Sequence, residues 1–326
     1  MADWQRELAE AYVSPEQLLR DLGLPASLAS SEAMASFSMR VPRSFAAKMR
    51  RADPQDPLLR QVLPIARENA AAPGYVADPV GDLAAVKAPG LLHKYAHRVL
   101  LNTTPACGVH CRYCFRREFP YAEVGHGHRS LLSADGAVAD HLGRHTDIQE
   151  IILSGGDPLS LSDERLRAVL AVLDAVPHLR RLRIHSRMPV VLPSRITPAL
   201  VQLLENSRFT VVLVIHANHA NECCDALRHG LQALRAAGVT VLNQAVLLRG
   251  VNDDVVSLVN LSERLMATGA LPYYLHMLDK VNGAAHFEVA EAPARALHTA
   301  LKARLPGYLV PRLVWEQPGA DSKSWL

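Results

Sequence analysis

Apolar residues gather in short runs from residue 98 onward, and many of these runs are rich in β-branched residues. Segments with the spacing of amphipathic helices separate the runs, and this alternation is typical of parallel βα units. The expected strands are 98–104, 148–156, 179–187, 209–217, 238–248 and 271–278. The expected helices between them are 130–145, 162–176, 197–206, 220–236 and 254–268.

Six such units are two fewer than a closed (β/α)8 barrel contains. The pattern therefore predicts an α/β fold built on a partial, open barrel or on a doubly wound sheet. Both architectures bind ligands at the carboxyl ends of their parallel strands, so functional side chains are expected directly after the strands.

The chain before the first expected strand has a different pattern. Residues 1–70 indicate short helices and irregular segments, and "SPEQLLRDLGL" predicts a helix that Ser14 caps. Proline and glycine are frequent in "RADPQDPLLRQVLP" and "AAPGYVADPVGD", which favours connectors or an extended arm. We expect an N-terminal helical and extended region at 1–92, a barrel core at 93–287, and a C-terminal helix and tail at 288–326.

Composition excludes several classes of protein. The net charge of +3 is too small to indicate a DNA-binding protein, and no run of 18 apolar residues predicts a membrane span. The polar beginning "MADWQRELAEAYVSPEQLL" lacks the basic and apolar parts of a secretory signal. Five cysteines, three of them clustered, do not resemble a secreted disulfide framework. These features predict a cytoplasmic protein.

The clustered cysteines are Cys107, Cys111 and Cys114, directly after the first expected strand. Three thiolates on one tight loop can bind one metal centre. A structural zinc ion would need a fourth ligand, for which His110 is a candidate. A [4Fe–4S] cluster with only three cysteines would keep one iron open for a reactant. Buried cysteines can also pack as small apolar residues, so the spacing by itself leaves all three interpretations open.

The Cys-x3-Cys-x2-Cys spacing, with Tyr113 before the last cysteine, resembles the radical S-adenosylmethionine superfamily. That resemblance implies a partial (β/α)6 barrel and a [4Fe–4S] cluster on Cys107, Cys111 and Cys114. S-Adenosyl-L-methionine would chelate the fourth iron and be cleaved to a 5′-deoxyadenosyl radical. "LSGGDPL" at 153–159 is similar to the segment that receives the amino group of S-adenosylmethionine. The corresponding residues are Ser154, Gly155, Gly156 and Asp157.

A longer part of the chain, from about residue 93 to 287, resembles the lysine 2,3-aminomutases. The matching segments include "HKYAHRVLLNTTPACGVHCRYCFRRE", "ILSGGDPLSL", "RLRIHSRMPVVLPSRIT", "HANHANE", "LLNQAVLLRGVND" and "YYLHMLDKVNGAAHF". The short chain, with "VPRSFAAKM", "DPLLRQVLP" and "GYLVPRL", is most similar to the branch that makes (R)-β-lysine for elongation factor P.

This resemblance implies a radical 1,2-amino shift that converts L-lysine to β-lysine with pyridoxal 5′-phosphate as a further cofactor. It also implies an electron-donor protein and a functional link to elongation factor P and its ligase, and it leaves a homo-oligomer open. Other interpretations remain open as well. They are a free-lysine 2,3-aminomutase of secondary metabolism, a radical enzyme that has lost the coenzyme, and a non-catalytic zinc-binding module.

Pyridoxal phosphate needs a lysine for its covalent attachment, and the resemblance nominates Lys323 among the six lysines of the chain. The departure from the family pattern is that Gly319, Ala320, Asp321 and Ser322 replace a run of glycines. The chain also ends three residues after Lys323, so a disordered terminal lysine is the alternative.

The resemblance assigns further contacts residue by residue. Lys94 and Arg98 would bind the coenzyme phosphate, and Arg116 would pair with the substrate carboxylate. Asp279 and Glu316 would bind the side-chain ammonium of the substrate. Gln244 is expected to bind in the cofactor pocket, which Gln244 and Asn252 line or frame. The histidines His185, His216 and His219 are expected only to line the site. Cys223 and Cys224 are expected to be packing residues.

Overall fold

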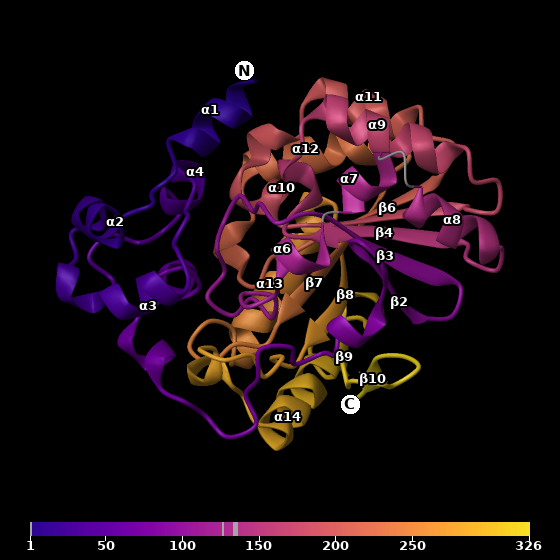
Figure 1. Cartoon of the computed structure of the whole chain (residues 1–326). Coiled ribbons are helices and arrows are strands. Elements are labelled where there is room, and N and C mark those ends of the chain that lie inside the picture. Colours follow the sequence, from indigo (N-terminus) through magenta and orange to yellow (C-terminus); the bar gives the residue numbers. More distant parts are fainter. Residues whose placement is uncertain (1, 126, 133–135) are drawn as a thin grey trace.

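The computed structural model describes residues 2–125, 127–132 and 136–326, and its centre is a mostly parallel sheet (Figure 1). The strands follow each other in chain order across the sheet, from β1 to β10. The parallel strands are β3 (Arg98–Thr104), β4 (Glu150–Gly155), β5 (Arg181–Ser186), β6 (Thr210–Ile215), β7 (Thr240–Val246), β8 (Leu271–His276) and β9 (Arg312–Trp315). Antiparallel strands extend both edges: β1 (Val86–Ala88) and β2 (Leu91–Tyr95) beside β3, and β10 (Ser324–Trp325) beside β9.

All six predicted strands are present, within two residues of the expected bounds, as β3 to β8. The partial barrel is therefore confirmed. Sequence analysis missed β9 and the two antiparallel additions, because strands of two to five residues are too short to show a period. The first antiparallel pair, β1 and β2, is a hairpin that turns at Pro89 and Gly90, and Gly90 takes a φ of 74° there.

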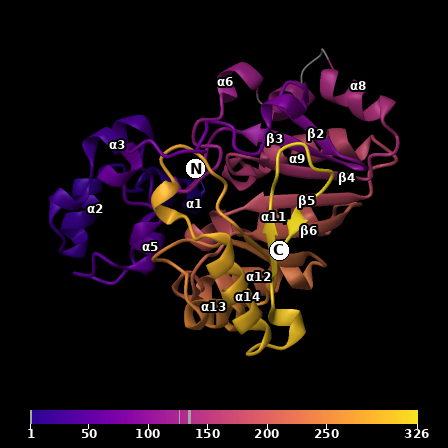
Figure 2. The same cartoon turned by 90° about the horizontal axis from the view of Figure 1, so that it is seen from below.

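Helices cover the outer face of the sheet and return the chain from the end of one strand to the start of the next (Figures 1 and 2). They are α7 (Gly127–Leu132), α8 (Ala137–Arg144), α9 (Asp163–Asp174), α11 (Pro198–Glu205), α12 (Asp225–Ala236), α13 (Val255–Thr268) and α14 (Glu291–Lys302). Three begin at a side-chain cap as expected for parallel units: Ser162, Thr197 and Asp254 each accept a backbone N–H of the first turn. The predicted helix 130–145 includes residues 133–135, which lie outside the described residues.

Short helices build the N-terminal arm, which lies beside the barrel in indigo in Figure 1. They are α1 (Asp3–Ala9), α2 (Pro15–Leu22), α3 (Ser31–Ser36), α4 (Arg43–Ala46) and α5 (Pro57–Arg60). The predicted cap of α2 is confirmed, because Ser14 Oγ accepts the Gln17 N–H at 3.2 Å. Leu18, Phe45 and Leu58 of this arm are fully buried in the main core. In the described residues, no helix is both long and apolar enough to cross a bilayer.

A buried ion pair joins the arm to the cysteine loop. Arg112 Nη2 lies 2.6 Å from Glu68 Oε2, and both side chains are inaccessible to solvent. The guanidinium also donates to the backbone carbonyls of Ala33 and Phe37, and Arg117 donates to the same Glu68 carboxylate. Because each charge is desolvated, neither partner can be removed without leaving the other uncompensated.

Replacing Arg112 by Met should lower the free energy of unfolding by about 3–5 kcal/mol, since the substitution leaves buried acceptors unpaired. Urea unfolding measures this loss. The matched control is Arg228→Met, which removes an exposed pair with Asp225 and should cost less than about 1 kcal/mol. Equal losses for the two variants would contradict the proposed importance of the Arg112–Glu68 contact.

Candidate active site

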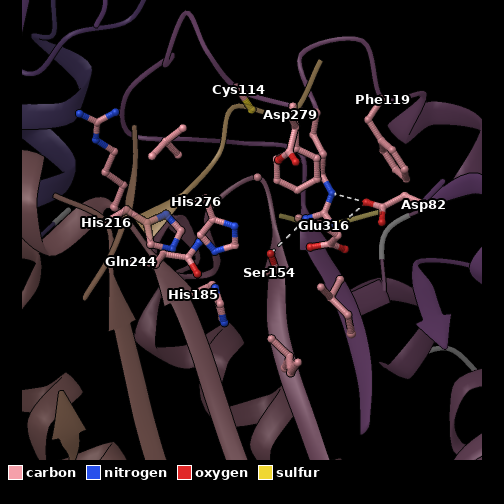
Figure 3. Close-up of a pocket in the computed structure, with 18 of the residues that line it drawn as sticks. Asp82, Cys114, Phe119, Ser154, His185, His216, Gln244, His276, Asp279 and Glu316 are labelled. Atoms are coloured by element: carbon pink, nitrogen blue, oxygen red, sulfur yellow. Dashed lines mark hydrogen bonds and ion pairs between the residues drawn. The ribbon is translucent and has the colours of Figure 1, made fainter. Parts of the chain in front are cut away.

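A cavity of about 780 Å³ opens at the carboxyl ends of the parallel strands. Every residue that sequence analysis nominated as catalytic, cofactor-binding, substrate-binding or metal-binding contributes to its wall. They are Lys94, Arg98, Cys107, Cys111, Cys114, Arg116, Ser154, Gly155, Gly156, Asp157, Gln244, Asp279, Glu316 and Lys323. Figure 3 shows His185, His216, His276 and Gln244 on one side and Asp82, Asp279 and Glu316 on the other. The structure thus brings the nominated residues together, while their individual roles stay predictions.

The three cysteines lie on the irregular loop between β3 and α6 (Tyr121–Val124), and all three thiols face the cavity. Burial, followed by the neighbouring thiols, raises the pKa of Cys107 and brings that of Cys114 to about 11. A cationic iron centre would supply the positive charge that thiolates need here. Three part-buried sulfur donors that face one chamber are therefore a suitable donor set for a cluster.

The Nδ1 atom of His110 is engaged by the backbone oxygen of Ser38 at 2.9 Å, although the residue lines the same cavity as the thiols. No group of three His, Cys, Asp or Glu side chains in the described ranges is arranged to hold a single metal ion. A cluster does not require such convergence, since each cysteine binds a different iron. Elsewhere, Cys223 is buried in the core, as expected of a packing residue.

A network of polar side chains holds the cysteine loop in place. Arg187, directly after β5, donates to Cys111 Sγ at 2.8 Å, to the Tyr113 hydroxyl, and to Gln61 Oε1 at 2.7 Å. Asn218, after β6, donates to the Tyr113 hydroxyl at 2.6 Å. The network connects the arm, the cysteine loop and two strand ends, and it lies among fully or nearly fully buried groups.

The Ser154–Asp157 segment packs closely against the cysteine loop. A Cβ on Gly156 would lie 2.5 Å from the Ala106 carbonyl oxygen, and Gly155 takes a φ of 110°. Both glycines are thus required by the approach of two backbone segments, in addition to any ligand.

Asp157 is already well supplied with donors. Its carboxylate accepts from Ser186 Oγ at 2.7 Å and from the backbone N–H groups of Leu159, Arg187 and Met188. In this structure Asp157 orders the strand ends, and its predicted contact with an ammonium group stays a prediction.

Alternating charges line the other wall. Arg116 Nη2 lies 2.7 Å from Asp82 Oδ2, and Lys94 Nζ lies 2.6 Å from Asp82 Oδ1. Lys94 also reaches Glu316 Oε1 at 3.3 Å, and Lys323 Nζ donates to Glu316 Oε2. Arg116 Nη1 in turn donates to Ser154 Oγ at 3.1 Å (Figure 3). We call this series of side-chain contacts the charge chain; it runs from Arg116 through Asp82, Lys94 and Glu316 to Lys323.

The ion pairs of the charge chain keep its acids ionised. Burial alone would raise the pKa of Glu316, but Lys323 and Lys94 bring it to about 2. In the same way, burial opposes ionisation of Asp82, while Arg116 and Lys94 hold its pKa below the usual value. Both carboxylates are therefore anionic at neutral pH.

Asp279 behaves differently. Burial, followed by the charge of Glu316, raises its pKa to about 7. Its Oδ1 has no hydrogen-bond partner among the described residues. A buried acceptor without a partner is suited to a cationic or hydrogen-bond-donating ligand.

The C-terminal tail is ordered by a short hairpin, so Lys323 is not a free terminal lysine. Ser324 pairs with Trp315 and Trp325 pairs with Val314, which places Lys323 opposite Glu316 where the connecting loop of the hairpin begins and ends. The Leu326 N–H donates to Leu313 O at 3.0 Å. Two strands that belong to the sheet therefore hold the nominated lysine at the cavity wall.

The histidines of the site are neutral. Burial, with Arg187 nearby, lowers the pKa of His216 to about 3, and burial also lowers the pKa values of His185 and His276 far below 6.5. His185 and His216 line the cavity as expected, and His276 lines it as well, but His219 lies outside it. Asn252 also lies outside the lining and supports it by donating to the Asn218 and Val246 carbonyls.

The two cations predicted to bind the coenzyme phosphate differ in how far other groups already engage their N–H donors. Lys94 is engaged with Asp82, Glu316 and the Val80 carbonyl. The Arg98 guanidinium stacks over the Tyr95 ring at 4.5 Å and faces the same cavity. Of the two cations, Arg98 therefore has the more available donors.

Sequence analysis missed three residues of the site. Asp82 lies in a segment interpreted only as a connector, and no local pattern marks it. Arg187 and His276 stand at the ends of β5 and β8. Their position at the carboxyl ends of predicted strands was a usable signal.

Comparison with known proteins agrees with this geometry. Residues 101–261 match the model of the Radical SAM superfamily. The chain is 47% identical to the L-lysine 2,3-aminomutase of Escherichia coli over 99% of this chain and 94% of that protein. It is 44% identical to the L-lysine 2,3-aminomutase of Haemophilus influenzae, over 99% and 95% of the two chains. The protein of that name from Clostridium subterminale is 34% identical over 99% of this chain and 77% of its own length. Identity of this extent shows that the chain belongs to the lysine 2,3-aminomutase family of radical S-adenosylmethionine enzymes.

Proposed function

We propose that the protein converts L-α-lysine to β-lysine by a radical 1,2-amino shift, and that it uses pyridoxal 5′-phosphate bound to Lys323. The observation that carries the proposal is that the Lys323 amine and the three cysteine thiols face one cavity. Radical S-adenosylmethionine enzymes contain a [4Fe–4S] cluster and S-adenosylmethionine. The coenzyme assignment has separate support from the ordered hairpin that carries Lys323.

When bound, the cluster and S-adenosylmethionine supply the radical that removes a substrate hydrogen, and the coenzyme supplies the carbonyl carbon that carries the migrating nitrogen. Cys107, Cys111 and Cys114 would hold the cluster, and the wall beside them, formed by the Ser154–Asp157 segment, would receive S-adenosylmethionine. Lys323 would hold the coenzyme, with Arg98 and Lys94 near its phosphate and Gln244 beside it.

The remaining groups would orient the substrate. Arg116 presents a guanidinium that Asp82 and Ser154 fix in place, which suits pairing with the α-carboxylate. Asp279 and Glu316 follow the adjacent strands β8 and β9 and offer two acids to the side-chain ammonium. The buried arm and loop around the cavity would exclude water from a radical.

We further propose that the product is (R)-β-lysine for elongation factor P and its ligase, and that a separate protein reduces the cluster. These proposals are supported by the resemblance of the N-terminal and C-terminal segments to that branch. The free-lysine enzyme of secondary metabolism performs the same chemistry, and genetic linkage to elongation factor P modification would distinguish the two.

Anaerobic incubation with L-lysine, S-adenosylmethionine, pyridoxal phosphate and a reductant, followed by chiral product analysis, tests the function. The wild-type protein should form β-lysine. Lys323→Ala should reduce turnover by about a thousandfold or more, because the coenzyme loses its attachment. Lys302→Ala, at an exposed position at the end of α14, is the control that should retain activity. Full activity of Lys323→Ala would show that another lysine holds the coenzyme.

The pH dependence of substrate binding tests the role of Asp279. A carboxyl group with a pKa of about 7 is neutral below that pH and anionic above it. The apparent KM for lysine should therefore fall as the pH rises through 7, because an anion binds the ammonium more strongly. Asp279→Asn should raise KM by about tenfold and abolish this pH dependence.

The exposed variant Asp225→Asn is the control for this measurement and should keep the wild-type profile. A KM that is independent of pH between 6 and 8 in the wild-type protein would exclude Asp279 from ammonium binding.

A further inference from the structure

The Glu316 carboxylate is fully engaged by groups of the chain itself. Lys323 Nζ donates to Oε2, and Lys94 Nζ and the Tyr95 hydroxyl each lie 3.3 Å from Oε1. The side chains of Glu316 and Lys323 are 18% and 23% exposed, so the pair is largely shielded from water. An incoming ammonium group would have to compete with these donors for the acid.

The Lys323 side chain also has the same functional group and alkyl stem as the part of the substrate that Glu316 would bind. A lysine side chain and an α,ω-diamino acid both end in an ammonium on a flexible alkyl stem. The hairpin register sets Lys323 opposite Glu316, so their contact forms within the folded tail and needs no ligand.

We infer that, without the coenzyme, Lys323 occupies the subsite for the substrate ammonium, and that coenzyme attachment to Lys323 opens this subsite to a diamino acid. This inference rests on the proposed function and adds a coupling between the coenzyme and substrate sites. It predicts that the coenzyme-free protein binds L-lysine weakly because its own side chain competes.

The charges of the charge chain support this coupling. Its three cations, Arg116, Lys94 and Lys323, pair with Asp82 and Glu316. The third acid of this local set is Asp279, which lies close enough to interact with its charges. With Asp279 ionised, this local set is balanced. When an aldehyde condenses with the Lys323 amine, the ammonium first releases one proton to solvent. The carbonyl oxygen then leaves as water with the two remaining hydrogens as the C=N bond forms. Loss of this positive charge leaves the acids in excess by one.

The position of Asp279 shows where the added ammonium would lie. Asp279 follows β8 by three residues and Glu316 is the residue directly after β9, and these strands are paired through His276 and Val314. Asp279 therefore lines the same cavity as Glu316, and its buried Oδ1 has no hydrogen-bond partner among the described residues. A substrate ammonium between the two acids would satisfy Asp279 and replace the contact that Lys323 gives up.

Calorimetric titration of L-lysine into the full chain tests the inference. The protein carries its cluster but is free of pyridoxal phosphate, and neither S-adenosylmethionine nor a reductant is added. Lys323→Met removes the competing ammonium and keeps the size of the side chain. This variant should bind L-lysine about tenfold more tightly than the wild-type protein, a typical coupling between sites. Lys323→Gln, which is uncharged and polar, should behave in the same way.

Two controls separate the ammonium effect from a general opening of the cavity. Norleucine has the alkyl chain of lysine without the ammonium, so its affinity should be the same for wild type and Lys323→Met. Lys302→Met should bind L-lysine as the wild-type protein does. Thermal unfolding of each variant verifies that the fold is intact.

The inference is overturned if L-lysine binds the wild-type protein and both Lys323 variants with equal affinity, or if none of them binds it. It is also overturned if norleucine gains as much affinity as L-lysine. Because no turnover occurs in this titration, its outcome is independent of whether β-lysine is formed. Failure of the proposed function and failure of this inference can therefore be told apart.

Discussion

The charge chain from Arg116 through Asp82, Lys94 and Glu316 to Lys323 is the interaction on which the cavity depends. It connects the cysteine loop, the N-terminal region, the β1–β2 hairpin and the C-terminal hairpin, which are far apart in sequence. Each contact is largely shielded from water, so removal of one member leaves a neighbour with uncompensated charge. The side chains of the charge chain form one wall of the cavity, and most of them are also nominated to bind the substrate or the coenzyme. Folding of this wall therefore places these binding groups in position.

Parallel strands explain why so much of the fold and site could be predicted from sequence. Their short, mainly apolar runs identified β3 to β8, and the carboxyl ends of parallel strands meet at one edge of the sheet. Cys107 and Asp279 follow two of these strands and Gln244 lies near the end of a third, and all three residues line one cavity as expected. The resemblance to a family added Lys323, which neither period nor spacing would have selected.

The missed features depend on contacts between distant segments. β9 and β10 are strands of four and two residues, and they form because β8 offers a free edge. Asp82 becomes a site residue only because Arg116 and Lys94 converge on it. Gly155 and Gly156 were nominated for a ligand, whereas the structure shows that the neighbouring backbone also requires them. A single sequence contains no local signal for such tertiary constraints.

The central claim is that three cysteines hold a cluster with one open iron in the cavity that contains Lys323. The most direct test is the electron paramagnetic resonance spectrum of the reconstituted, reduced protein, recorded before and after addition of S-adenosylmethionine. The structure predicts a [4Fe–4S]⁺ signal that changes when S-adenosylmethionine binds the open iron. A signal that is unaffected by S-adenosylmethionine, or the absence of any cluster signal, would contradict the claim.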